Sequence, residues 1–241
     1  MMTLVIQKWL QRGFGLLTLF ALNTAHAQQD AKVLIRQLNQ RMQVIQDYTA
    51  SVQMHFDIPG VKMRDMQGKV FFKQPGKFKI KAKGIFFLPK QNPMQDVNAL
   101  LKDTASYTTV ISGYETIDGH ECAVVNVIPL KTDNELILGK FWIDVKDPLI
   151  YKSQMTTKNN GTLETSSIFG AYKKYGLPDA LLIKVEVNKI KVPKMMSVDL
   201  NKKSAPKSDK NLKEPGYIQI KFIGYKINSR FSDTVFTDDA Q

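Results

Sequence analysis

The sequence predicts a mainly β protein in which one amphipathic helix lies across one face of a curled antiparallel sheet. Three observations support this fold class. Apolar residues recur at helical spacing in one segment, and they alternate with polar residues through most of the remaining chain. Short turn signals separate the alternating segments, as in antiparallel hairpins. The composition, 43% hydrophobic and 23% charged, excludes a disordered or collagen-like chain.

Length and composition also limit the function classes. The 241 residues suit one or two domains, and the formal net charge is +12. The single cysteine excludes an intrachain disulfide and a Cys-rich zinc module. Three histidines leave little material for metal or general-base chemistry, so we expect no metal and no other cofactor.

Residues 1–27 have the features of a secretory signal peptide. Lys8 and Arg12 supply a positive region, an apolar run follows at 14–22, and a small-x-small cleavage site ends at Ala27. The alternative is a retained membrane anchor, but about nine apolar residues are too few to span a bilayer as a helix. The residue directly after Ala27 is Gln28 and not the cysteine of a lipobox, so we expect cleavage there to release a soluble chain without a lipid anchor.

Export changes the meaning of the positive charge. A basic cytoplasmic chain would suggest nucleic acid as the partner. An exported chain instead meets anionic lipid headgroups, lipopolysaccharide or a membrane surface, and we expect no nucleic acid. The alternative, that the lysines only keep a β-rich surface soluble, stays open.

The first element of the mature chain is an amphipathic helix over residues 31–46, with Asp30 as its N-cap. Its apolar positions follow the helical period and are Leu34, Leu38, Met42 and Ile45. The polar side is made up of Gln37, Asn39, Gln40, Arg41 and Gln43. Such a helix needs a sheet to cover its apolar face.

Three strands with a period of two follow the helix. The first carries alternating apolar residues from Tyr48 to Ile58, the second from Met66 to Phe72. Pro59-Gly60 and Gln74-Pro75-Gly76 are the turn signals after these strands. In the third strand the apolar residues alternate with Lys77, Lys79, Lys81 and Lys83. These four lysines share one face, which is therefore either solvated or in contact with something anionic.

Residues 84–104 interrupt the alternation. An apolar stretch bounded by Gly84 and Pro89 includes Phe86, and a short helix that includes Leu100 is expected after Pro93. An insertion of this kind inside a β-meander is either a lid over a binding site or a plug that completes the core.

Strands then continue almost to the end of the chain, with about ten in total. We expect them at 106–113, 120–129, 135–145, 149–157, 162–172, 180–188 and 216–227. Asp118-Gly119, Asp147-Pro148 and Asn160-Gly161 are the turn signals between them. A lysine-rich segment at about 189–215 has a disorder-like composition and is interpreted as a flexible insertion. It is either a docking loop for an acidic partner or membrane, or a solvated insertion.

The sequence offers little for catalysis. After cleavage only His55 and His120 remain, and neither lies in a nucleophile-elbow context. His55 falls on the polar side of its strand, where an exposed surface histidine is expected. The segment 115–121 gathers acidic residues and His120, but Asp118-Gly119 explains it as a turn. Cys122 is expected to be a buried, inert thiol. We therefore expect a protein that is not an enzyme.

The remaining feature is shape. A curled sheet with a helix and an apolar lid on its concave side can enclose a hydrophobic cavity, and Met and Phe side chains repack easily around varied acyl chains. The expected lining is Met54, Phe56, Met66, Val70, Phe72, Phe78, Ile80, Phe86 and Leu100. The alternative is that these residues fill a closed core.

A strand-turn-strand motif adds to this interpretation. Residues 68–78 read G-x-V-x-x-K-x-P-x-x-F, and the segments 119–125, 141–144 and 228–236 give further matches. With these motifs the sequence resembles the outer-membrane lipoprotein carrier superfamily, which includes LolA, LolB and RseB-like proteins. The resemblance spans nearly the whole mature chain, so residues 28–241 are expected to form one LolA-like domain.

The resemblance implies an incomplete, half-open β-barrel with a helical lid, which binds acyl chains in the periplasm of a Gram-negative bacterium. The expected function is a carrier that shuttles a lipid or lipoprotein acyl chain toward the outer membrane. Its partners would be an inner-membrane transporter or an outer-membrane acceptor. In this family an Arg helps to hold the lid closed, and Arg64 is the nearest candidate. The alternative is an RseB-like protein that senses lipid and regulates a membrane partner.

Overall fold

The computed structural model describes residues 30–59, 63–82, 101–131, 136–158, 161–185 and 215–237. Within these ranges the chain forms one longer helix, α1 (Ala31–Gln43), two 3-10 helices and ten strands. None of the described helices is long and apolar enough to cross a membrane. The predicted signal peptide, most of the lid segment and nearly all of the lysine-rich insertion lie outside the described residues.

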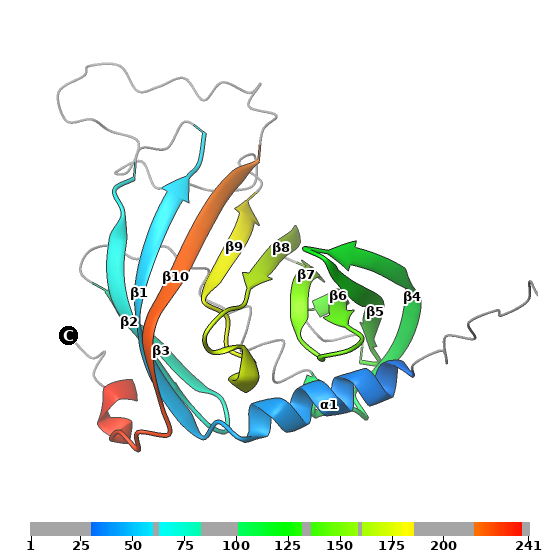
Figure 1. The fold of residues 1–241 in the computed structure, drawn as a ribbon, viewed down its shortest axis with the longest axis horizontal. Coiled ribbons are helices and arrows are strands. Elements are labelled where there is room, and N and C mark those ends of the chain that lie inside the picture. The colour runs from blue at the N-terminus through cyan, green and yellow to red at the C-terminus, as the bar shows by residue number, and fades with distance from the viewer. Residues whose placement is uncertain are drawn as a thin grey trace, which may run out of the picture.

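The ten strands form a single antiparallel sheet, as the sequence predicts. They are β1 (Asp47–Asp57), β2 (Met66–Lys73), β3 (Lys77–Ala82), β4 (Tyr107–Ile117), β5 (His120–Pro129), β6 (Leu136–Asp144), β7 (Ile150–Thr157), β8 (Gly161–Ile168), β9 (Ala180–Val185) and β10 (Gly216–Ile227). Their order is β3-β2-β1-β10-β9-β8-β7-β6-β5-β4, so β3 and β4 are the two edges and the sheet is not closed. Figure 1 shows the sheet curling from β3 round to β4 as a half-open barrel.

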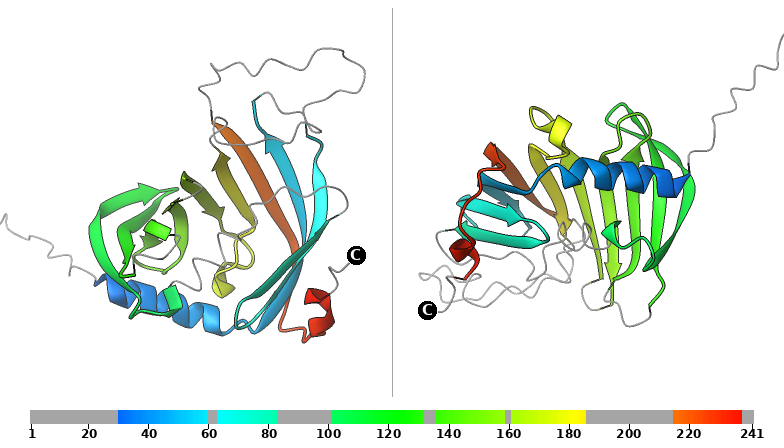
Figure 2. Two further views of the ribbon diagram at one scale, coloured as in Figure 1. Left: turned by 180° about the vertical axis from the view of Figure 1, so that it is seen from behind. Right: turned by 90° about the horizontal axis from the view of Figure 1, so that it is seen from below.

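The helix α1 begins where the sequence predicts and ends three residues earlier. The Asp30 carboxylate caps it by accepting from the Lys32 N–H at 2.9 Å. The predicted end at residue 46 is wrong, because Ile45 continues the apolar period but packs with the strands after the helix has ended at Gln43. Figure 2 shows that α1 runs across the strands of the β4–β9 part of the sheet.

Two apolar clusters occupy the concave side of the sheet. The helix cluster joins the buried face of α1 to β4–β7 and contains Ala31, Leu34, Ile35, Leu38, Leu101, Tyr107, Ala123, Val125, Val127, Phe141, Ile143 and Met155. The strand cluster joins β1–β3 to β9 and β10; its buried members are Ile45, Tyr48, Ala50, Val52, Met54, Phe56, Ile58, Val70, Leu177, Leu181, Ile183, Ile218, Ile220 and Tyr225. One continuous sheet therefore carries two separate cores on this side. A third buried cluster contains Cys122, Val124, Trp142, Leu149 and Tyr151.

Turn chemistry fixes several connections. Asp118 and Gly119 both have positive φ, as the predicted hairpin turn between β4 and β5 requires. The predicted strand 162–172 is too long, because the backbone N–H of Ala171 donates to the side chain of Asp179 rather than to a neighbouring strand. The 3-10 helix η1 (Lys173–Tyr175) follows and ends at Gly176 in the left-handed conformation.

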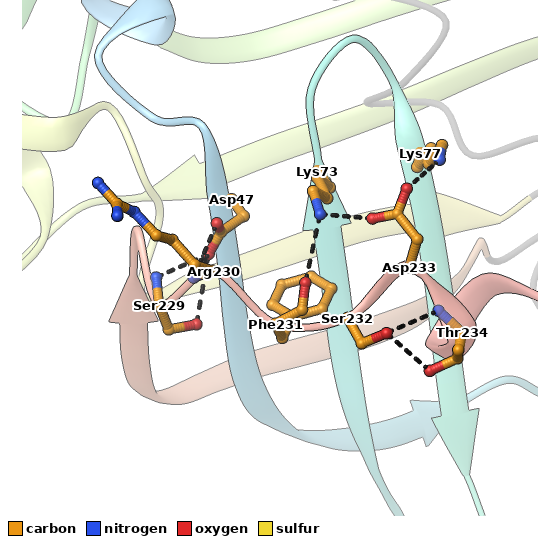
Figure 3. Close-up of polar contacts among 9 residues, drawn as sticks. All are labelled: Asp47, Lys73, Lys77, Ser229, Arg230, Phe231, Ser232, Asp233 and Thr234. Atoms are coloured by element: carbon orange, nitrogen blue, oxygen red, sulfur yellow. Dashed lines mark hydrogen bonds and ion pairs between the residues drawn. The ribbon is translucent and has the colours of Figure 1, made fainter.

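The C-terminal segment 228–237 returns over the outer face of β1–β3 and ends in the 3-10 helix η4 (Asp233–Phe236). The buried carboxylate of Asp47 accepts hydrogen bonds from the backbone N–H groups of Ser229 and Arg230, at 2.8 and 3.0 Å. Asp233 lies between Lys73 and Lys77 and pairs with both (Figure 3). The segment is therefore fixed at its start and again near its tip.

Candidate lipid-binding site

The residues predicted to line the cavity lie together on the concave face. Seven of them lie in or against the strand cluster: Met54, Phe56, Met66, Val70, Phe72, Phe78 and Ile80. The cross-strand pairs Val70–Ile80 and Phe72–Phe78 place four of them on adjacent strands. Met54, Phe56 and Val70 are buried, and the other four are half-buried. Phe86 and Leu100 lie outside the described residues. A lipid contact at this face stays a prediction.

An apolar cavity of about 80 Å³ lies beside this face, between α1 and strands β7–β9. Its lining is Leu38, Arg41, Met42, Leu149, Ile150, Ser153, Met155, Thr165, Ser167, Phe169, Gly176, Pro178 and Leu181. Met155 belongs to the helix cluster and Leu181 to the strand cluster, so the cavity is the seam between the two cores. None of the seven described residues of the predicted set lines it.

A charged group adjoins the cavity and reaches its lining through Arg41. Arg41 of α1 pairs through Nη2 with Asp147 of the β6–β7 turn, and Lys173 of η1 lies 3.3 Å from the other oxygen of Asp147. Partial burial raises the pKa of the Asp147 carboxyl, but the hydrogen bonds and charges of Arg41 and Lys173 outweigh it and lower the pKa. These contacts tie α1 to two loops on the sheet.

A polar chain continues from this group into the sheet. Tyr151 hydrogen-bonds Lys173 and lies 3.1 Å from Nε2 of His120, whose Nδ1 lies 2.7 Å from Asp144. The same Asp144 carboxylate accepts the N–H of Lys146 at 2.8 Å and so holds the β6–β7 turn. His120 thus joins a hydrogen-bonded chain. No group of three or more His, Cys, Asp or Glu side chains in the described ranges is placed to hold a metal ion.

The remaining predicted residues take varied positions. His55 is exposed, as predicted, and lies 2.7 Å from Asp65. Cys122 is buried, as predicted, and burial raises the pKa of its thiol to about 11. Arg64 is exposed just before β2, and its role as a lid latch stays a prediction because the lid lies outside the described residues.

The predicted basic surface occupies the outer face of β3. Cross-strand pairing sets Lys77 opposite Lys73, Lys79 opposite Phe71, and Lys81 opposite Lys69. Lys77 pairs with Asp233, so part of this face is in contact with an anionic group of the same chain. Lys83 lies outside the described residues.

A second concavity, of about 400 Å³, is polar. It lies between α1 and the region around β4 and is lined by Lys32, Ile35, Arg36, Asn39, Gln40, Gln43, Thr104, Tyr107 and Thr109. Charged and amide groups on one wall do not suit an acyl chain, so the seam between the two cores is the better candidate.

Sequence reasoning missed the position of Arg41. The sequence pattern predicts Arg41 on the polar side of the helix, but its side chain is only 24% exposed and lines the cavity. The available signal was its spacing, because Arg41 lies three residues after Leu38 and seven after Leu34, both on the buried face.

Comparisons with known proteins agree with the fold. No protein-family model matches the sequence, and no curated protein matches it significantly. A LolA superfamily protein from Nitrosomonas europaea aligns with a TM-score of 0.55 and 11% identity, over 88% of this chain and 100% of that one. A DUF1329 family protein from Desulfovibrio piger aligns with a TM-score of 0.53 and 13% identity, over 85% and 95%.

A domain assigned to outer membrane lipoprotein sorting in Vibrio parahaemolyticus aligns with a TM-score of 0.50 and 9% identity, over 86% of this chain and 97% of that one. At these identities the likeness is one of fold. The chain thus has the open, curled fold of the LolA superfamily, and the structural neighbours fit the resemblance seen in its sequence.

Proposed function

We propose that the protein is a periplasmic carrier that binds the acyl chain of a lipid or lipoprotein and shuttles it toward the outer membrane. The observation that carries this proposal is the apolar cavity at the seam between the two cores, beneath α1 on the concave face. The fold shared with a LolA superfamily protein supports it. The proposed role involves binding and release rather than catalysis.

The cavity must widen to hold an acyl chain. Its volume of about 80 Å³ is smaller than the ~150 Å³ apolar cavity that accepts benzene. Met42 and Met155 line it, and methionine side chains repack with little penalty. Burial stabilises by about 0.8 kcal/mol per methylene, which gives roughly 8 kcal/mol for a ten-carbon chain. This exceeds an association cost at the low end of its range, roughly 4 kcal/mol.

Release of cargo requires contact with a membrane or with a membrane protein. We propose that Lys79 and Lys81, with Lys77 and Lys83, attract anionic headgroups at this step. Co-sedimentation with vesicles containing phosphatidylglycerol tests this: Lys79→Glu/Lys81→Glu should weaken binding at low salt. The control reverses two exposed lysines elsewhere, Lys131 and Lys146; of the tested pair, Lys81 is exposed and Lys79 is half-buried. Equal binding by the wild type and the Lys79/Lys81 variant at every salt concentration would contradict the headgroup role and leave these lysines only the role of keeping the surface soluble.

Native mass spectrometry of gently purified protein tests acyl binding. Ser167 lines the cavity, whereas its neighbour Ser166 points to the opposite face of the same strand, where it pairs with Lys152. Ser167→Phe should fill the cavity and remove a lipid adduct that the wild type and Ser166→Phe retain. The proposal fails if the wild type carries no lipid and, after delipidation, takes up neither fatty acid nor lipoprotein.

A transfer assay separates the carrier from the alternative, a lipid-binding regulator. The loaded protein is mixed with acceptor vesicles or outer-membrane fractions, and the movement of labelled lipid is followed. A carrier releases its lipid to the acceptor. A regulator binds lipid but retains it, and its occupancy changes the affinity for a protein partner.

A further inference from the structure

Arg41 lies among mainly apolar residues that line the cavity, and its guanidinium group is only partly paired. Its side chain extends from α1 across Gly176: a β-carbon at that glycine would lie 3.3 Å from Cδ and 3.5 Å from Cγ of Arg41. The stem therefore packs tightly against the loop after η1, and Arg41 is one of the residues that line the cavity. A long cationic side chain is thus fixed beside the proposed site of the acyl chain.

The two arms of the guanidinium differ. Nη2 pairs with one oxygen of Asp147, whose other oxygen faces Lys173. Nη1 is buried and has no hydrogen-bond partner among the described residues. A carboxylate that faced Arg41 with both oxygens would satisfy both arms, but Asp147 divides its oxygens between two cations. A buried donor of a charged group without a partner is unfavourable, so this arm favours a ligand that supplies an acceptor.

The local charge favours an anionic acceptor. Arg41 and Lys173 bring two positive charges to the single carboxylate of Asp147. The rest of the cavity lining is mainly apolar, with Met155 and Leu181 on the sheet side. An amphiphile with its chain against these residues would bring its polar head to Arg41.

We infer that Arg41 is the headgroup site of the cavity: its Nη1 binds an anionic oxygen, from a carboxylate or a phosphate, of an amphiphile whose acyl chain fills the seam. This inference rests on the proposed acyl binding and adds the class of head that is recognised. Phosphate and carboxylate share the chemistry that a guanidinium arm binds, so both are tested.

The experiment compares three ten-carbon probes with the same chain: decanoate, decyl phosphate and decanol. Their affinities for the delipidated protein are measured by calorimetry. Arg41→Met keeps an apolar side chain of similar length, and Arg36→Met on the exposed side of α1 is the matched control. We expect the wild type and Arg36→Met to bind at least one anionic probe about 10-fold or more tightly than decanol. Arg41→Met should lose this preference and keep its affinity for decanol.

The outcomes separate the two proposals. If the wild type binds none of the three probes, acyl binding itself fails. If the wild type binds all three equally, or if Arg41→Met keeps the preference for anions, the headgroup site is overturned and acyl binding stands. The difference between decanoate and decyl phosphate identifies the preferred head.

A second measurement needs no variant. In wild-type protein labelled with ¹⁵N-arginine, the anionic probe that binds more tightly should shift the Arg41 Nη resonances, and decanol should not. Equal shifts with that probe and decanol, or no shift with that probe bound, would overturn the inference even if Arg41→Met fails to fold.

Discussion

Replacement of Asp47 by Ala should loosen the C-terminal segment and lower the stability of the fold. Asp47 is 3% exposed, and its carboxylate accepts from the N–H and Oγ of Ser229 and from the N–H of Arg230. Hydrogen bonds to a charged group are worth about 1.5–3 kcal/mol each. Ser229 and Arg230 are exposed, so water can replace part of what the carboxylate supplied. We therefore expect a loss of about 2 kcal/mol.

The loss can be measured by urea and thermal unfolding of the mature chain. For a domain of this size about 2 kcal/mol lowers Tm by about 4–8 °C. Asp47→Asn keeps one acceptor oxygen and should lose about half as much free energy. Asp57→Ala, at the exposed end of the same strand, is the control and should stay within about 0.5 kcal/mol of the wild type. If Asp47→Ala and Asp57→Ala have the same stability, the anchoring role of Asp47 is wrong.

Three further predictions concern single positions. Hydrogen bonds from Lys73 and Lys77 lower the pKa of Asp233 to about 2. The contribution of Asp233 to the stability of the fold is therefore complete above about pH 4 and is lost as the pH falls from about 4 to 2. The difference in urea midpoint between the wild type and Asp233→Asn should shrink over that interval, and a constant difference would refute this prediction. Gly68→Ala should destabilise the fold by about 1–3 kcal/mol, because its β-carbon would lie 2.9 Å from the carbonyl oxygen of Lys81. Gln67→Ala is the exposed control, and equal unfolding midpoints for the two variants would contradict this prediction. Cys122 should resist thiol reagents at pH 8 in the native state and react in guanidinium chloride, since it is buried and its thiol pKa is about 11. Fast labelling of the native protein would contradict this prediction and show that β5 opens.

Local periodicity predicted most of the fold. The two-residue alternation around Met54 and Phe72 identified the strands and the shared face, because a strand sends successive side chains to opposite sides whatever its partners are. The Gly68 motif also has a physical basis, since the glycine allows the β3 backbone to approach. The same periodicity wrongly extends α1 to Ile45, an apolar residue that packs in the strand cluster after the helix has ended.

The candidate site was less accessible to sequence reasoning. Arg41 meets Asp147, which lies 106 residues further along the chain, and no local pattern reports such a contact. The seam between the cores arises from how Met155 and Leu181, on different strands, face α1 across the curved sheet. The sequence predicts an apolar concave face, but the position of a gap in it depends on the packing of distant elements.

Nuclear magnetic resonance of protein labelled at the methionine methyl groups, with bound decanoate, tests acyl binding at the seam most directly. Met42 and Met155 line the cavity, and Met54 and Met66 belong to the predicted concave surface. We expect nuclear Overhauser effects from the decanoate chain to Met42 and Met155, with Met54 and Met66 added if the chain extends along the strand cluster. Bound decanoate with no such contact to any of these four methyl groups would contradict acyl binding on the concave face.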